Sequence, residues 1–246
     1  MKNKIVLSVR IAAVVVIIFS VLYIIKNEIE YKRAEEEYLT LSEYAEKNDD
    51  TDSDRNQYDD VINVDYESLK KINSDFIGWI FADNGKISYP LVQSRDNKEY
   101  LTKTFKGKHN KSGTIFADKS DSGLENYQSR IFGHCMNNGT MFAGLMRYKD
   151  KNYISEAPYF YIYTKDGIRK YEIFSVYKDF PENVIFLNNN TESERKNTYK
   201  EIKSKSDYNI NTDDNILSGS GAVATLITCD DKDDRYRVVV NGKRIE

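Results

Sequence analysis

The 246-residue chain contains only two cysteines, two histidines, three prolines and one tryptophan. Two cysteines cannot build a disulfide framework, and this pair lacks the Cys-x-x-Cys spacing of a zinc or redox site. Because His109 and His134 are the two histidines, any chemistry that needs an imidazole has two candidates. The chain also lacks a basic excess, since its net charge is −3 and its pI about 5.6, which argues against nucleic acid as a partner.

Aromatic and charged residues, by contrast, are plentiful. Aromatic residues make up 13% of the chain, with 19 tyrosines, and charged residues make up 30%. Together with a hydrophobic content of 40%, this composition is typical of a globular protein with ample core material. It excludes wholesale disorder.

One long apolar run lies near the N-terminus. Residues 5–25 are almost wholly apolar, and Ile11–Ile25 carries no charge. As a helix rising about 1.5 Å per residue, such a run spans roughly the 30 Å hydrocarbon core of a bilayer. Lys2, Lys4 and Arg10 lie toward its N-terminal side, so the positive-inside rule predicts a single-pass protein of the cell membrane with a cytoplasmic N-terminus and an extracellular remainder. A cleaved signal peptide is the alternative, which the length of the run and the lack of a small-x-small cleavage site disfavour.

The segment after the apolar run is expected to separate an anchor from a folded domain. Glu28–Lys47 is rich in helix formers and carries charges of both signs, which is typical of an exposed helical stalk. Asp49–Asp60 is strongly acidic, but it lacks the glycine and terminal glutamate of a calcium loop, so a solvated linker is favoured. The expected organisation is a cytoplasmic tail (1–4), a transmembrane anchor (5–25), a helical stalk with an acidic linker (26–60) and a catalytic domain (61–246).

Strand signals dominate residues 61–246. Eight β-branched or aromatic runs, most of them bounded by Gly, Asn or Asp, are expected to be strands. They are Ile77–Ala82, Ile87–Val92, Thr114–Phe116, Arg130–Phe132, Tyr159–Tyr163, Tyr171–Tyr177, Ala222–Thr228 and Tyr236–Val240. Asp166-Gly167 predicts a hairpin, and helices are expected at Tyr66–Ile72, from near Met141, and at Glu192–Lys205. The sequence predicts a mostly β fold with peripheral helices, a barrel of about eight strands.

Two chemically active residues stand where apolar runs end. Cys229 ends the run Ala222–Thr228, and His134 follows Arg130–Phe132 after one glycine. Alone, a free cysteine is more often a small buried hydrophobe and a lone histidine more often structural. Together, in an extracellular domain, they supply the thiol and imidazole of nucleophilic acyl transfer.

Two arginines are candidate partners for the thiol. Arg235 and Arg237 lie six and eight residues beyond Cys229, and in an extended strand they share a face, so either can return beside the cysteine. A guanidinium there lowers the pKa of the thiol and stabilises charge on a carbonyl oxygen. The aspartates of the intervening loop are potential competitors for that arginine, or can raise the pKa of Cys229.

These residues resemble the signatures of sortases, the membrane-anchored cysteine transpeptidases of Gram-positive bacteria. Thr225–Cys229 (TLITC) is similar to the family's TLxTC motif, and Arg237–Lys243 is similar to its arginine strand. Phe132–Met136 (FGHCM) resembles its catalytic histidine segment, and the order His, Cys, Arg agrees. Further segments resemble class B sortases: Phe76–Ile80, Ile87–Gln93, Asn110–Asp118 and the expected helix Glu192–Lys205.

The resemblance implies a sortase-type closed β-barrel and a reaction that needs no cofactor or metal. Cys229 would be the nucleophile that attacks the threonine carbonyl of a C-terminal Pro-x-Thr-x sorting motif in a secreted protein, forming a thioester. His134 would be the general acid and base, and Arg237 would hold the substrate and the oxyanion. Thr228 and Asn110 match positions of the substrate groove. The implied partners are sorting-motif proteins, a peptidoglycan precursor or cross-bridge amine, and membrane lipid around the N-terminal helix.

The sequence departs from the family pattern at Cys135, where an asparagine is usual, and at Ile227, where some class B members have serine. Three interpretations of Cys135 are open: a second nucleophile, a disulfide partner for Cys229, or a packing residue. Alternation along an extended segment favours the packing residue, because Cys135 would then face away from whatever His134 addresses. Two other functions stay open: an L,D-transpeptidase, whose arginine lies much closer to its cysteine, and a non-catalytic surface adhesin with a structural Cys and His.

Overall fold

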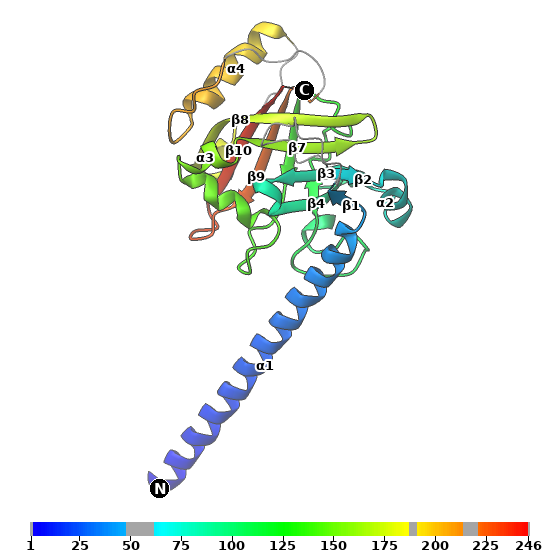
Figure 1. Cartoon of the computed structure of the whole chain (residues 1–246). Coiled ribbons are helices and arrows are strands. Elements are labelled where there is room, and N and C mark those ends of the chain that lie inside the picture. Colours follow the sequence, from blue (N-terminus) through cyan, green and yellow to red (C-terminus); the bar gives the residue numbers. More distant parts are fainter. Residues whose placement is uncertain (1, 48–61, 187–190, 214–220, 246) are drawn as a thin grey trace.

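The computed structural model describes residues 2–47, 62–186, 191–213 and 221–245, and Figure 1 shows its architecture, a β-barrel from which one long helix extends. Asp49–Asp60, the expected linker, lies outside the described residues. The barrel strands are β3 (Phe76–Ala82), β4 (Ile87–Val92), β5 (Ile115–Ala117), β6 (Gln128–Phe132), β7 (Tyr159–Thr164), β8 (Gly167–Asp179), β9 (Val223–Cys229) and β10 (Arg237–Arg244).

These eight strands close into a barrel in the order β10-β8-β7-β3-β4-β5-β6-β9, which confirms the predicted fold class. The pairs β4–β5 and β6–β9 are parallel, whereas the remaining neighbours are antiparallel. The hairpin at Asp166-Gly167 is confirmed, because Thr164 pairs with Gly167 across it. Strand β10 runs beyond its predicted end through Asn241–Lys243, poor strand formers that the ladders to β8 and β9 hold in place.

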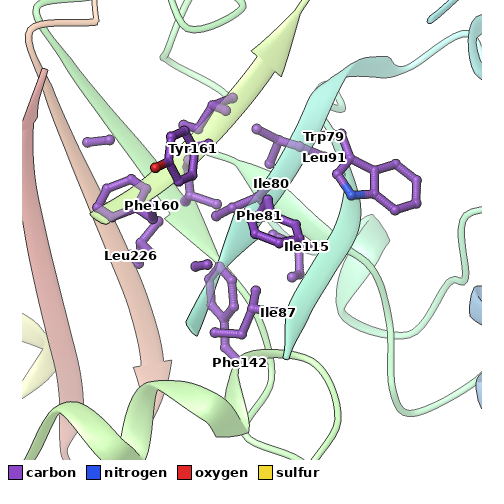
Figure 2. Close-up of a cluster of buried hydrophobic side chains, with 14 of the residues drawn as sticks. Trp79, Ile80, Phe81, Ile87, Leu91, Ile115, Phe142, Phe160, Tyr161 and Leu226 are labelled. Carbon is purple, nitrogen blue, oxygen red and sulfur yellow. The ribbon is translucent and has the colours of Figure 1, made fainter. Parts of the chain in front are cut away.

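Aromatic and aliphatic side chains fill the barrel (Figure 2). Labelled members of this core come from β3, β4, β5, β7 and β9, and Phe142 joins them from the segment that follows β6. The buried Trp79 also satisfies its indole N–H, which donates to the Ser88 hydroxyl at 3.0 Å. Consecutive residues of β3, β7 and β9 are buried, so these strands are covered on both faces, and a second apolar cluster surrounds Phe174 and Tyr199.

The helices match the predictions in part. Helix α2 (Tyr66–Ile72) is confirmed, and α4 (Glu192–Ser204) begins with a capping box between Thr191 and Glu194. The segment from Met141 forms the 3₁₀ helix η3 (Phe142–Lys149) and the short α3 (Tyr153–Glu156). Further 3₁₀ turns are η1 (Asp83–Gly85), η2 (Glu99–Leu101) and η4 (Pro181–Asn183), and a small antiparallel sheet pairs β1 (Ala45–Lys47) with β2 (Ile62–Val64).

Helix α1 (Lys2–Ser42) joins the apolar run and the expected stalk in one continuous helix. Its apolar part is the one helix in the described residues that is long and apolar enough to cross a membrane. The prediction of an exposed stalk is wrong for the last turns of α1, because Ala34, Tyr38 and Leu41 are buried there against the barrel. These residues recur at helical spacing and form a narrow stripe that the surrounding glutamates and lysines obscured in the sequence.

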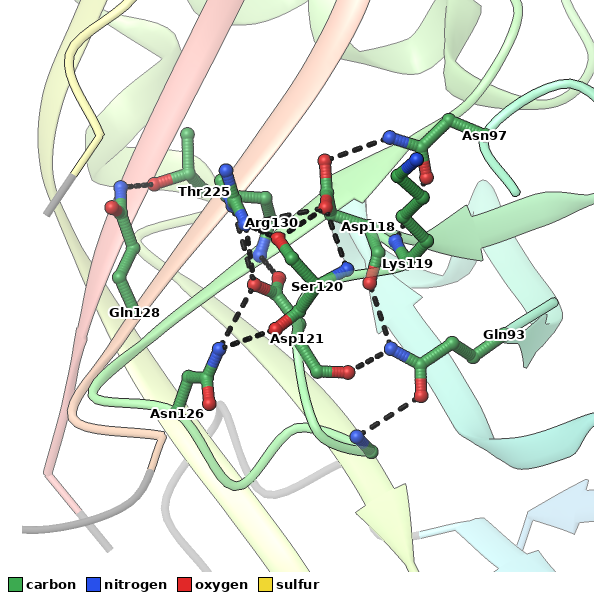
Figure 3. Close-up of polar contacts among 11 residues, drawn as sticks. Gln93, Asn97, Asp118, Lys119, Ser120, Asp121, Asn126, Gln128, Arg130 and Thr225 are labelled. Carbon is green, nitrogen blue, oxygen red and sulfur yellow. Dashed lines mark hydrogen bonds and ion pairs between the residues drawn. The ribbon is translucent and has the colours of Figure 1, made fainter. Parts of the chain in front are cut away.

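A polar cluster fixes the connection between β5 and β6, the strand that leads to His134 (Figure 3). Asp121 is buried at 1% exposure, and its carboxylate accepts hydrogen bonds from the backbone N–H of Arg130 (2.6 Å) and from its guanidinium (2.9 Å). The same guanidinium contacts Asp118 at 3.2 Å. Burial raises the pKa of Asp121 above its ordinary value, against the opposing hydrogen bonds from Arg130.

We expect Arg130→Met to lower the free energy of unfolding by about 3 kcal/mol, because it leaves the buried Asp121 carboxylate without its guanidinium. Arg235→Met is the matched control. It removes an arginine whose pair with Asp233 is exposed to solvent, and should change stability by less than about 0.5 kcal/mol. Urea denaturation of both variants measures the difference, and equal stabilities would contradict the structural role of this cluster.

Candidate active site

Strand β9 lies between β6 and β10, and the two ladders bring three distant residues to one end of the barrel. In the antiparallel pair, Arg237 is the direct partner of Cys229. In the parallel pair, Phe132 is the partner of Ile227, and the N–H of Gly133 donates to the Ile227 carbonyl at 3.2 Å. His134 follows Phe132 by two residues, as Cys229 follows Ile227, so the two reach the same level of the barrel.

A buried polar chain across the three strands holds this register. The Gln128 amide on β6 donates to the Thr225 hydroxyl on β9 at 2.7 Å, and that hydroxyl donates to the side-chain Oδ1 of Asn241 on β10 at 2.8 Å. Figure 3 shows the first of these contacts. A slip of either ladder would leave these buried groups without partners, so the chain selects one register.

A pocket of about 310 Å³ opens at this end of the barrel. It is lined by His134, Thr228, Cys229 and Arg237, together with Asn97, Leu101, Phe116, Phe132, Gly133, Pro181 and Ile227. The structure therefore brings together four of the five site residues predicted from the sequence. Asn97, Leu101 and Pro181 were missed, since they come from segments whose approach to the pocket no local pattern reveals.

The imidazole of His134 is held by a backbone group. Its Nε2 lies 2.8 Å from the Leu101 carbonyl oxygen, and because a carbonyl oxygen only accepts, Nε2 carries the proton and donates. The His134 carbonyl in turn accepts from the N–H of Phe142 at 2.9 Å. The first contact holds the half-buried ring at the mouth of the pocket, and the second fixes the backbone that carries it.

The two arginines differ in place and in partners. Arg237 begins β10 and is half-buried, and its Nη1 donates to the carbonyls of Asp234 (2.8 Å) and Tyr236 (3.1 Å). Arg235 is exposed in the preceding loop, where it bonds to the Asp233 carboxylate. Only Arg237 lines the pocket, and it binds neutral carbonyls, which leave its positive charge available to a substrate.

The acidic loop after Cys229 is neutralised by other cations. The buried Asp230 accepts from Lys149 at 2.6 Å and from Lys178, and Lys149 also reaches Asp231 at 2.9 Å. Although burial opposes ionisation, these lysines hold the pKa of Asp230 below its ordinary value. The competition of Asp230, Asp231 and Asp233 for Arg237, considered from the sequence, is therefore not what the structure shows.

The two remaining candidates from the sequence, Thr228 and Asn110, lie in different places. Thr228 is buried beside the pocket, and its hydroxyl has no hydrogen-bond partner within the described part of the chain. Asn110, by contrast, does not line this pocket. Its amide nitrogen donates to the Glu30 carbonyl on α1 at 2.8 Å, and its oxygen accepts from the Ser112 N–H at 2.9 Å. Asn110 thus forms a turn and holds α1, and the sequence alone does not distinguish this structural role from substrate binding.

Cys135 and Cys229 are both free thiols. Burial, reinforced by the nearby Asp231, raises the pKa of Cys135 to about 11, so this thiol stays protonated at neutral pH. A protonated thiol is a poor nucleophile, which agrees with the predicted packing role of Cys135. Among the described residues, no group of three or more His, Cys, Asp or Glu side chains is arranged to hold a metal ion.

Comparisons with known proteins identify the family. A sortase domain model matches residues 83–245. The chain is 31% identical to the sortase B of Listeria monocytogenes over 199 residues, 75% of each chain, and 28% identical to that of Staphylococcus aureus over 246 residues, 97% of this chain and 96% of the other.

Solved structures agree with this assignment. The sortase B of Clostridium perfringens is 30% identical with a TM-score of 0.66, over 73% of this chain and 99% of that one. The sortase B of Bacillus anthracis, solved in complex with AAEK1, is 26% identical with a TM-score of 0.71, over 89% and 99% of the two chains. The L,D-transpeptidase and adhesin alternatives are therefore set aside, and the chain belongs to the sortase family of cysteine transpeptidases, in class B.

Proposed function

We propose that this sortase cleaves a Pro-x-Thr-x sorting motif of secreted proteins after the threonine and joins the threonine to an amine of a cell-wall peptide. The observation that carries the proposal is the meeting of a thiol, an imidazole and a guanidinium at one pocket, with Arg237 the strand partner of Cys229. Apolar walls from Leu101, Phe116 and Ile227 suit a proline-containing motif. A relative, the sortase B of S. aureus, is known in complex with a substrate.

The first half of the reaction forms an acyl-enzyme. The Cys229 thiolate attacks the threonine carbonyl, and the carbonyl electron pair moves to oxygen, where the Arg237 guanidinium stabilises the charge. As the tetrahedral intermediate collapses, the peptide C–N bond breaks and His134 gives its proton to the leaving amine. The product is a thioester between Cys229 and the threonine.

The second half reverses the roles. A cell-wall amine attacks the thioester while His134 accepts its proton, and the new amide forms as the C–S bond breaks. The thioester conserves the free energy of the original peptide bond, so no external energy source enters the balance. The acids of the β9–β10 loop, paired with Lys149 and Lys178, leave the Arg237 charge free for the oxyanion.

Cys229→Ala should abolish cleavage of a quenched sorting-motif peptide, because no other residue of the pocket supplies a thiol. Cys135→Ala is the matched control and should keep near-normal turnover. Circular dichroism should report a native fold for both variants. Substantial turnover in Cys229→Ala, or its loss in a folded Cys135→Ala, would overturn the nucleophile assignment.

Arg237→Ala should lower kcat/KM for the same peptide by about a hundredfold or more, the usual effect of losing an oxyanion donor. Arg235→Ala should retain most activity, since Arg235 points its guanidinium to Asp233 in the exposed loop. Steady-state kinetics on both variants decide the matter, and the opposite ranking contradicts the role given to Arg237.

We further propose that α1 anchors the enzyme with residues 5–25 in the membrane, tail 1–4 in the cytoplasm and the catalytic domain outside. The apolar, exposed first part of α1 and the positive charges before it support this topology. External protease should digest the barrel on intact cells whose wall has been made permeable. Protection of the barrel under those conditions would reverse the orientation.

A further inference from the structure

The Leu101 carbonyl that binds His134 stands at the end of η2, directly before the loop of residues 102–114 that leads to β5. Gly113, near the end of this loop, lies close to Tyr100 and Leu101, the residues just before the loop begins. With φ at +61°, a Cβ on Gly113 would lie 2.3 Å from the Tyr100 carbonyl oxygen and 2.9 Å from that of Leu101. The N–H of Thr114 also donates to the Tyr100 carbonyl at 2.9 Å. The backbone of Gly113 and Thr114 therefore packs closely against residues 100 and 101, the segment that carries the carbonyl bound to His134.

Helix α1 forms hydrogen bonds with the same loop at several points. The Tyr38 hydroxyl donates to the Gly113 carbonyl and lies 3.1 Å from the Thr114 hydroxyl. The Glu37 side chain, 6% exposed, accepts from the N–H of Lys106 at 2.8 Å. Nearer the membrane-spanning part, the side chain of Asn110 donates to the Glu30 carbonyl, and Lys111 donates to the Asn27 side chain, each at 2.8 Å.

The contacts form an unbroken path from the anchor helix to the active site. The path runs from the Tyr38 hydroxyl to the Thr114 hydroxyl, and from the Thr114 N–H to the Tyr100 carbonyl. Tyr100 is bonded in sequence to Leu101, whose carbonyl binds the His134 imidazole. We propose that the end of α1 is part of the active-site scaffold and that Tyr38 is a positioning residue for His134. This inference rests on the proposed function, in which His134 moves the proton.

The physical basis is the sensitivity of proton transfer to geometry. A general acid must sit within hydrogen-bond reach of the leaving amine, so a small displacement of its ring lowers the rate of the chemical step more than it lowers binding. The rest of the peptide pocket is lined by Asn97, by residues of β5, β6, β9 and β10, and by η4. Helix α1 packs instead against β4, which contributes no residue to this pocket. Loss of the Tyr38 hydroxyl should therefore change kcat rather than KM.

The test compares Tyr38→Phe with Tyr199→Phe in the full chain, reconstituted in lipid nanodiscs. Both hydroxyls are on buried rings and reach a backbone carbonyl, of Gly113 and of Asp213 respectively, but Tyr199 belongs to α4 and has no part in the path. We expect Tyr38→Phe to lower kcat about fivefold with KM within twofold of wild type. The ¹⁵N resonances of the His134 ring should shift in Tyr38→Phe and stay unchanged in Tyr199→Phe.

A second pair of variants guards against a folding defect. Glu37→Ala removes the acceptor for the Lys106 N–H, whereas Glu37→Gln keeps an oxygen in its place. We expect the alanine variant to lower kcat and shift the His134 resonances, and the glutamine variant to recover most of both. Equal losses in the two variants would mean that they act through general destabilisation, and would overturn the proposal.

The outcomes separate this inference from the proposed function. Wild-type kcat and unchanged His134 resonances in Tyr38→Phe would overturn the positioning role while the transpeptidase mechanism stands. Equal effects of Tyr38→Phe and Tyr199→Phe would overturn it as well. If the wild-type chain failed to cleave the peptide, the proposed substrate would be wrong, and the His134 resonances would still decide whether Tyr38 positions the ring.

Discussion

The hydrogen-bonded chain from Gln128 through Thr225 to Asn241 ties β9 to its neighbours on both sides, and the site depends on the register that it holds. Side chains on a strand alternate between faces, so a slip of one residue would turn Cys229 away from the pocket and out of line with Arg237. Three residues far apart in the sequence thus meet because two ladders share one strand.

The charged residues near the end of β9 also help to keep Arg237 at the pocket. The turn after Cys229 is rich in aspartate, whose carboxylates, if left unpaired, would draw Arg237 away from the pocket. Lys149 from η3 and Lys178 from β8 both pair with Asp230, so this carboxylate does not compete for Arg237. Arg237 rests on backbone carbonyls, so its charge is oriented without being neutralised. The half-buried Cys135 thiol nearby has a raised pKa, in keeping with a packing role.

Local sequence patterns were enough to predict the strands, the hairpin and the pairing of His134 with Cys229, whereas the choice of Arg237 over Arg235 came from the family resemblance. These features depend on β-propensity, on turn chemistry and on motifs in which the reactive residue follows its strand directly. The packing of α1 was not predicted, because its buried stripe is narrow and includes the charged Glu37. The role of Leu101 was beyond reach for another reason. It acts through its backbone carbonyl, and a carbonyl leaves no mark on the identity of the side chain.

The most direct test of the central claim is intact-protein mass spectrometry of the full chain incubated with a sorting-motif peptide and no amine acceptor. The account predicts an added mass equal to the peptide fragment through threonine, mapped by proteolysis to Cys229 and discharged when an amine is supplied. An adduct on Cys135, or cleavage of the peptide without any covalent adduct at Cys229, would contradict it.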